Sequence, residues 1–152
     1  MSAATRPQIL LTNDDGIQSP GLWAAAQALS ALGYVYVTAP RDQVSGSGRS
    51  VPPTSDGRIL SQRLQIGGQE WPVYAVGGTP AQVVMHGVME IRPQPPDLVV
   101  SGINYGENPG LSVTVSGTVG AALEAASMGI PALAVSLELE DISTYLEHRD
   151  DV

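Results

Sequence analysis

The residues best suited to chemistry are two neighbouring carboxylates, Asp14 and Asp15, in the segment Asn13–Gly16 near the start of the chain. They follow the apolar run Ile9–Thr12, which is typical of a buried strand that ends in a turn. Two ionised carboxylates side by side repel one another unless a cation neutralises them. The pair therefore predicts a cation site, with a simple turn capped by Asx side chains as the alternative interpretation.

Polar residues also follow three later segments that are predicted as strands, and their types complement the acidic pair. These residues are Ser45, Gly78, Thr79 and Asn104. Because ligands of parallel sheets bind beyond the carboxyl ends of the strands, we expect all of them to meet Asp14 and Asp15 at one edge of the sheet. Carboxylate, hydroxyl and amide oxygens are ligands for a hard cation, so the expected cofactor is Mg²⁺ or Mn²⁺.

Two Gly-Thr segments, Gly77–Thr79 and Ser116–Thr118, stand where helices are expected to begin. Free N–H groups and the helix dipole favour phosphate at such positions. Ser and Thr are also the commonest helix caps, so each segment taken alone is more simply a cap. Beside a cation site, the two segments together suggest a phosphate ester as the ligand. The resulting phosphate-binding candidates are Gly78, Thr79, Ser116, Gly117 and Thr118.

The sequence that positions these residues supplies strands and helices in alternation. The predicted strands are 9–12, 34–38, 71–76, 97–101 and 131–135, and the predicted helices are 20–32, 80–89 and 116–128. Such alternation implies βαβ crossovers. The predicted fold class is therefore α/β, a Rossmann-like, doubly wound and mainly parallel sheet with helices on both faces.

Three features of the sequence are harder to place in this pattern. Residues 41–68 are rich in turn-forming residues and are expected to connect small edge strands. Pro72 predicts that its strand begins at a sheet edge. Residues 101–110 are rich in Gly and Asn and are predicted to be a long binding loop, in which Asn108 either caps the backbone or contacts the ligand.

Composition excludes several classes of function. The 152 residues suit one domain, and 43% of them are hydrophobic, enough for a sizeable core. The chain has neither Lys nor Cys, which rules out a P-loop lysine, a Schiff base, thiol nucleophiles and zinc–thiolate sites. A net charge of -8 argues against a nucleic-acid polymer or an anionic membrane as partner. Because the sequence shows no apolar signal core or membrane-length run, the expected location is the cytoplasm.

Five ordered segments resemble the signature blocks of the SurE family, the stationary-phase survival nucleotidases. The blocks are residues 9–17, 45–48, 78–81, 97–108 and 116–124. The resemblance implies a Rossmann-like domain and a C-terminal part that exchanges a hairpin and a helix between subunits, giving homodimers or homotetramers. Because the family continues well beyond residue 152, the chain resembles a form truncated at the C-terminus. We expect a SurE-like domain at 1–136 and the acidic start of the missing part at 137–152.

The resemblance also implies a reaction. Family members are divalent-metal-dependent phosphatases of nucleoside 5′- and 3′-monophosphates, and some also hydrolyse short polyphosphate. The family's metal ligands fall on Asp14, Asp15, Ser45 and Asn104. Our hypothesis is that Asp14, Asp15 and Asn104 are also the catalytic residues, through a cation that activates water. The alternative is a metal- and nucleotide-binding domain without turnover, because the oligomerisation part is missing.

Overall fold

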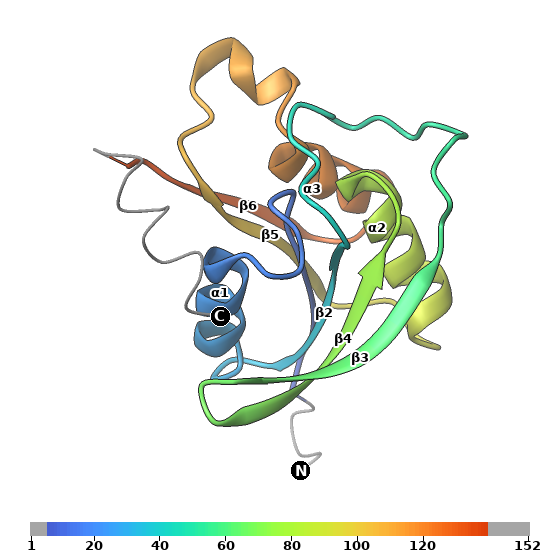
Figure 1. Cartoon of the computed structure of the whole chain (residues 1–152), viewed down its shortest axis with the longest axis vertical. Helices are drawn as coiled ribbons and strands as arrows, with labels where there is room; N and C mark the ends of the chain where they lie inside the picture. Colours follow the sequence, from blue (N-terminus) through green and yellow to red (C-terminus); the bar gives the residue numbers. More distant parts are fainter. Residues whose placement is uncertain (1–5, 140–152) are drawn as a thin grey trace.

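The computed structural model describes residues 6–139 of the chain. Six strands form one sheet in the order β3-β4-β2-β1-β5-β6 (Figure 1). In chain order they are β1 Gln8–Thr12, β2 Tyr34–Pro40, β3 Ile59–Ile66, β4 Gln69–Val76, β5 Leu98–Tyr105 and β6 Ala132–Leu137. Every neighbouring pair is parallel except the antiparallel hairpin β3–β4. The predicted Rossmann-like, mainly parallel α/β sheet is confirmed.

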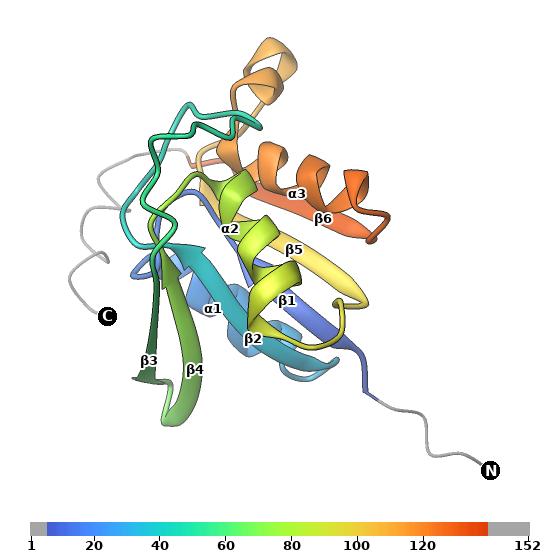
Figure 2. The ribbon, with the colours of Figure 1, turned by 90° about the vertical axis from the view of Figure 1, so that its right-hand side faces the viewer.

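Helices cover both faces of this sheet (Figure 2). They are α1 Pro20–Leu29, α2 Pro80–His86 and α3 Gly117–Ser127, with a π-helical turn η1 at Gly87–Ile91 and a 3₁₀ turn η2 at Gly110–Thr114. The helix α1 lies on one face, and α2 and α3 lie together on the other. This is the doubly wound arrangement that the alternation of strands and helices predicts.

Alternate residues of β1 contribute to two cores because successive strand side chains point to opposite faces. Ile9 and Leu11 belong to the core under α1, together with Leu22. Leu10 belongs to the opposite core, together with Ala121 of α3. Leu10 and Leu11 are fully buried, and each contributes about 1.5–3 kcal/mol of transfer free energy relative to an exposed side chain. The strand that carries the acidic pair is thus held firmly from both faces.

The segment between β2 and β4 differs from the expected small edge strands. β3 is one eight-residue strand, and a two-residue turn of Gly67 and Gly68 joins it to β4. Both glycines have a positive φ, 59° and 76°, which tight hairpin turns of this kind require. Pro72 lies in the half of β4 that pairs with β3 alone, and pairing with β2 begins at Val73. The expectation of an edge position holds for that half only.

The end of β5 also differs from the prediction. The strand runs on to Tyr105 instead of ending at Ser101, and a register shift against β6 separates Ser101 from Asn104. The predicted loop over 101–110 is therefore wrong in its first half, because Asn104 lies on the strand. The residues that follow, together with the loop after β2, gather beyond the carboxyl ends of the strands (Figure 1).

Candidate active site

The acidic pair lies where the order of the strands reverses. From β1 the chain passes through α1 to β2 on one side, and it returns later through α2 to β5 on the other side of β1. Ligands of open α/β sheets bind in the crevice at such a switch point. Asp14 and Asp15 follow β1, and the N–H of Tyr105 on β5 donates to Asp15 Oδ2 at 3.4 Å. The two strand ends meet as predicted.

The turn after β1 is held by the side chain of Asn13 and not by those of Asp14 or Asp15. Its Oδ1 accepts from the N–H of Gly16 at 3.2 Å, and its Nδ2 donates to the Gly16 carbonyl at 2.9 Å. Gly16 has a φ of 94°, a conformation that favours glycine. The turn that offered the simpler interpretation of this segment therefore exists, but Asn13 makes it and the two carboxylates are left for another purpose.

Asp14 is buried, with 6% of its surface exposed, and the first turn of α3 approaches its carboxylate. Thr118 Oγ1 donates to Asp14 Oδ1 at 2.8 Å, and the N–H groups of Gly117 and Thr118 also stabilise the charge. Burial raises the pKa of Asp14 above its ordinary value, while these hydrogen bonds oppose the shift. Gly117 permits the close approach, since a Cβ there would lie 2.8 Å from the Cβ of Asp14.

Asp15 is half-buried and experiences the charge of its neighbour. Burial and then the charge of Asp14 raise the pKa of Asp15 to about 6. Among residues 6–139, none of the ion pairs includes either carboxylate of the acidic pair. Two carboxylates whose pKa values are raised in this way form a site that a cation would stabilise.

The loop after β2 brings Ser45 to the acidic pair through Gln43. Gln43 Nε2 donates to Ser45 Oγ at 3.1 Å and to Asp15 Oδ1 at 3.4 Å. The loop is also anchored by the N–H of Val44, which donates to the Asp14 carbonyl at 2.8 Å. Sequence reasoning missed Gln43, although an amide two residues before a candidate ligand, in the same loop, was a usable signal.

Asn104 lies on β5 directly before Tyr105, whose N–H contacts Asp15. Its Nδ2 donates to the Gly106 carbonyl at 2.7 Å, which leaves the amide oxygen as the atom for a ligand. Within residues 6–139, no group of three or more His, Cys, Asp and Glu side chains is placed to hold a metal, so hydroxyl and amide oxygens would have to supplement two carboxylates. The predicted set does this with oxygen atoms alone, which fits Mg²⁺ or Mn²⁺. Its members are Asp14, Asp15, Ser45 and Asn104.

The first predicted phosphate segment, at the start of α2, is used within the protein. Thr79 Oγ1 accepts from the N–H of Gln82 at 3.3 Å and donates to the Ser50 carbonyl at 2.6 Å. The Gln82 side chain in turn accepts from the N–H of Thr79 at 3.0 Å, which completes a capping box. Gly78 lines a pocket beside the loop after β2. Thr79 acts here as a helix cap.

The second predicted phosphate segment, at the start of α3, lies against the acidic pair. Ser116 caps the helix by accepting from the N–H of Val119 at 3.2 Å, and the Thr118 hydroxyl is committed to Asp14. Asn108 contacts another part of the protein, because its Nδ2 donates to Ser136 Oγ on β6 at 2.7 Å. The structure thus brings the start of α3 to the predicted ligands, and it places Asn108 beside β6.

Fold and site together define an α/β protein with an acidic, oxygen-donor site at its topological switch point. Residues 9–151 match the family model of Survival protein SurE, and the chain belongs to the SurE family. It is 52% identical over 142 residues to 5′-nucleotidase SurE of Methanopyrus kandleri, covering 93% of this chain and 53% of that protein. The SurE protein from Aquifex aeolicus, a solved structure, is 38% identical with a TM-score of 0.73, covering 95% of this chain and 56% of that chain.

The family match concerns only part of longer proteins. The chain spans about half the length of the curated relatives it matches, including 5′-nucleotidase SurE of Archaeoglobus fulgidus, at 49% identity over 139 residues, with 91% of this chain and 52% of that protein covered. The acidic segment expected at 137–152 lies largely outside the described residues, so its separation from 1–136 stays a prediction. Among the residues that the structure does describe, no helix has the length and apolar character to cross a membrane.

Proposed function

We propose that this chain carries the catalytic centre of a divalent-metal-dependent nucleotidase that releases phosphate from nucleoside 5′-monophosphates. The observation that carries the proposal is the acidic pair at the switch point, where burial raises the pKa of Asp14 and Asp15 and the loop after β2 links Ser45 to Asp15 through Gln43. Relatives that are about half identical to this chain are named 5′-nucleotidases, which supports the class of reaction.

The proposed roles divide between ligands and the residues that orient them. The ligands of the cation would be Asp14, Asp15, Ser45 and Asn104. A cation bound there supplies a Lewis acid for the phosphoryl oxygens and lowers the pKa of a bound water. Thr118 orients Asp14 through its hydroxyl. Gln43 donates to both Asp15 and Ser45 and so holds the two side chains near one another. Supporting hydrogen bonds of this kind orient the side chains that ligate a metal.

The start of α3 would receive the phosphate. The dipole of α3 favours an anion beside its first turn. The N–H groups of Gly117 and Thr118 already stabilise the carboxylate of Asp14, so the phosphate would lie next to that carboxylate and its cation. Ser116 and Thr118 flank it at the first turn. An Asp carboxylate of the pair would orient the attacking water by accepting a hydrogen bond from it.

Phosphate release from a panel of nucleotides tests the proposal. The panel contains nucleoside 5′- and 3′-monophosphates and tripolyphosphate, each with Mn²⁺, Mg²⁺ or EDTA. We expect release that needs a metal, that EDTA abolishes, and that is strongest for the 5′-monophosphates. Mn²⁺ binding by calorimetry without any release would contradict turnover and favour the alternative, a metal- and nucleotide-binding domain. Sedimentation of the same sample tests the homodimer or homotetramer that the family resemblance implies.

A further inference from the structure

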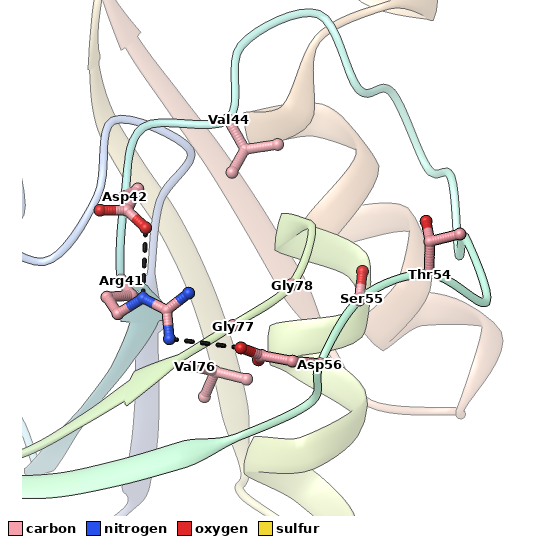
Figure 3. A pocket seen from close by; sticks show the side chains of 9 residues that line it. All are labelled: Arg41, Asp42, Val44, Thr54, Ser55, Asp56, Val76, Gly77 and Gly78. Atoms are coloured by element: carbon pink, nitrogen blue, oxygen red, sulfur yellow. Dashed lines mark hydrogen bonds and ion pairs between the residues drawn. The ribbon is translucent and has the colours of Figure 1, made fainter.

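A pocket of about 360 Å³ lies beside the loop after β2 (Figure 3). Its lining residues come from the loop after β2, from the segment before β3 and from the end of β4. Val44 lines the pocket, precedes Ser45 in the chain and donates its N–H to the carbonyl of Asp14. Val44 therefore connects the pocket to the segment that carries the acidic pair. The volume falls within the range of about 300–1,000 Å³ that small-molecule sites occupy.

Asp56 is a carboxylate of the pocket that two donors contact. Its Oδ1 accepts from the N–H of Arg58 at 3.0 Å, and its Oδ2 accepts from Arg41 Nη1 at 3.5 Å. It also lies against Gly77, where any Cβ would overlap the carboxylate. The hydrogen bond from Arg58 is the main cause that lowers the pKa of Asp56, so this group is an ionised acceptor at neutral pH.

The charges of the pocket favour a neutral partner that donates hydrogen bonds. Asp42 and Asp56 both contact Arg41, so two carboxylates surround one guanidinium (Figure 3). The surplus negative charge disfavours a phosphate inside the pocket, while the carboxylates keep acceptor positions for hydroxyl groups. Val44, which is partly exposed, adds an apolar surface against which a ring can pack. Acidic side chains hold ribose hydroxyls in this manner in other nucleotide-binding α/β folds.

We propose that this pocket is the ribose subsite, and that the carboxylate of Asp56 accepts hydrogen bonds from the ribose hydroxyls of the substrate. The inference rests on the proposed function, because the phosphate of the same nucleotide would lie at the acidic pair beside Ser45. The two neighbouring sites then divide the substrate by charge. The cation site takes the phosphate, and the pocket takes the neutral sugar.

Binding of uncharged nucleosides tests the subsite without any need for turnover. Adenosine and 2′,3′-dideoxyadenosine are titrated by NMR into the metal-free chain and into Asp56→Asn. For the unsubstituted chain we expect adenosine to bind on the order of tenfold more tightly, the effect of hydrogen bonds to a charged acceptor. In Asp56→Asn this preference should fall to about threefold or less, since a neutral acceptor forms weaker bonds. Equal binding of the two nucleosides by the unsubstituted chain would overturn the proposal.

Two further variants separate the subsite from general effects. Glu70→Gln removes the same charge at the distant β3–β4 hairpin, so it should retain the full preference for adenosine. Thr54→Trp fills the pocket from the segment before β3, so it should weaken both nucleosides alike while Mn²⁺ still binds at the acidic pair. Loss of the preference in Glu70→Gln, or unchanged nucleoside binding in Thr54→Trp, would contradict the assignment.

The proposed function can fail independently of the subsite. A ribose preference that depends on Asp56, in a chain that releases no phosphate with any metal, would contradict the nucleotidase but support the pocket as a nucleoside site. Phosphate release with identical kcat/KM for 5′-AMP and 2′,3′-dideoxy-AMP would support the nucleotidase and overturn the role of Asp56.

Discussion

Two pairs of carboxylates lie at the same edge of the sheet in different electrostatic surroundings. One pair is Asp14 and Asp15, and the other is Asp42 and Asp56. The first two are buried or half-buried, and burial is the main cause that raises their pKa. The second two are exposed, both contact Arg41, and the pKa of Asp56 is lowered, chiefly by a backbone N–H. A bound cation would therefore stabilise the first pair. The second pair already contacts the guanidinium of Arg41 and keeps oxygen atoms that can accept from hydroxyl groups.

The contrast shows that residue type does not decide the ligand. Asp14 is buried against the first turn of a helix, and Asp56 lies on a glycine at the surface. Dielectric and neighbouring charge differ between these two places, and these set whether a carboxylate favours a metal or a hydroxyl donor. The predictions below test the contrast, beginning with the largest expected effect.

Replacing a carboxylate of each pair should affect the metal in only one case. Asp14→Asn removes a charged ligand, so we expect Mn²⁺ affinity measured by calorimetry to fall by more than the roughly 10–100-fold cost of losing a supporting residue. Asp56→Asn removes the same charge from the second pair and should change the affinity by less than about threefold, because its carboxylate already contacts a cation. Comparable losses in both variants would abolish the distinction between the pairs.

Thr118→Val tests whether the start of α3 positions Asp14. The substitution keeps the shape but removes the hydroxyl that donates to the carboxylate at 2.8 Å. We expect Mn²⁺ affinity to fall by about 10–100-fold, and Thr118→Ser to restore most of it. Thr79→Ala is the matched control at α2, where it should lower the unfolding free energy by about 1 kcal/mol through loss of the cap but spare the affinity. A Thr118→Val chain with unchanged Mn²⁺ affinity would contradict the positioning role.

Much of the fold could be predicted because it depends on local patterns. The apolar runs and the Gly, Pro and Ser signals at their ends predict the parallel strands and the helices. β3 escaped prediction because its exposed residues alternate poorly with buried ones, and its identity depends on pairing with β4. The turn at Gly67 and Gly68 was a hairpin signal that the sequence contained. The extension of β5 to Asn104 depends on its register against β6, which no local pattern contains.

The candidate site was predictable where one rule applied to several strands. Carboxyl ends of parallel strands share an edge, so the rule alone brought Asp14, Asp15 and Asn104 into one neighbourhood. The supporting contacts were not predictable, because each joins segments that are distant in the sequence. The bridge from Gln43 to Asp15 and the contact of Asp56 with Gly77 need a particular path of the intervening loop. Metal ligation by these residues stays a prediction.

Gln43→Ala should have a smaller effect than the changes at Asp14 and Thr118. Gln43 spans Asp15 and Ser45 at 3.4 Å and 3.1 Å, distances at the long end for hydrogen bonds, and its side chain is exposed. We expect Mn²⁺ affinity to fall by about three- to tenfold, at the low end of supporting residues. Gln62→Ala, an equally exposed change on β3, should leave it unaltered. The role of Gln43 fails if both variants bind Mn²⁺ as the unsubstituted chain does.

The smallest predicted effect is the pH dependence of stability in the metal-free chain. The pKa of Asp15 is 3.8 in the unfolded state and about 6 in the folded state. Between these values the folded chain holds a proton that the unfolded chain has released, so this group lowers stability as the pH rises through the window and has no further effect above it.

Thermal unfolding in EDTA at pH 4.5 and pH 7 measures this contribution as the difference between the unsubstituted chain and Asp15→Asn. Because Asp15 is partly open to solvent, we discount the shift to about 1 kcal/mol, which corresponds to about 2–4 °C in Tm at this chain length. Asp15→Asn should gain this amount at pH 7 and only about a third of it at pH 4.5, where the folded Asp is protonated but the unfolded Asp is already mostly ionised. Saturating Mn²⁺ should remove the penalty in the unsubstituted chain, because a bound cation offsets the charge that burial disfavours. A gain of equal size at both pH values would mean that the substituted amide stabilises by packing, and the electrostatic contrast between the two acidic pairs would then have no consequence for stability.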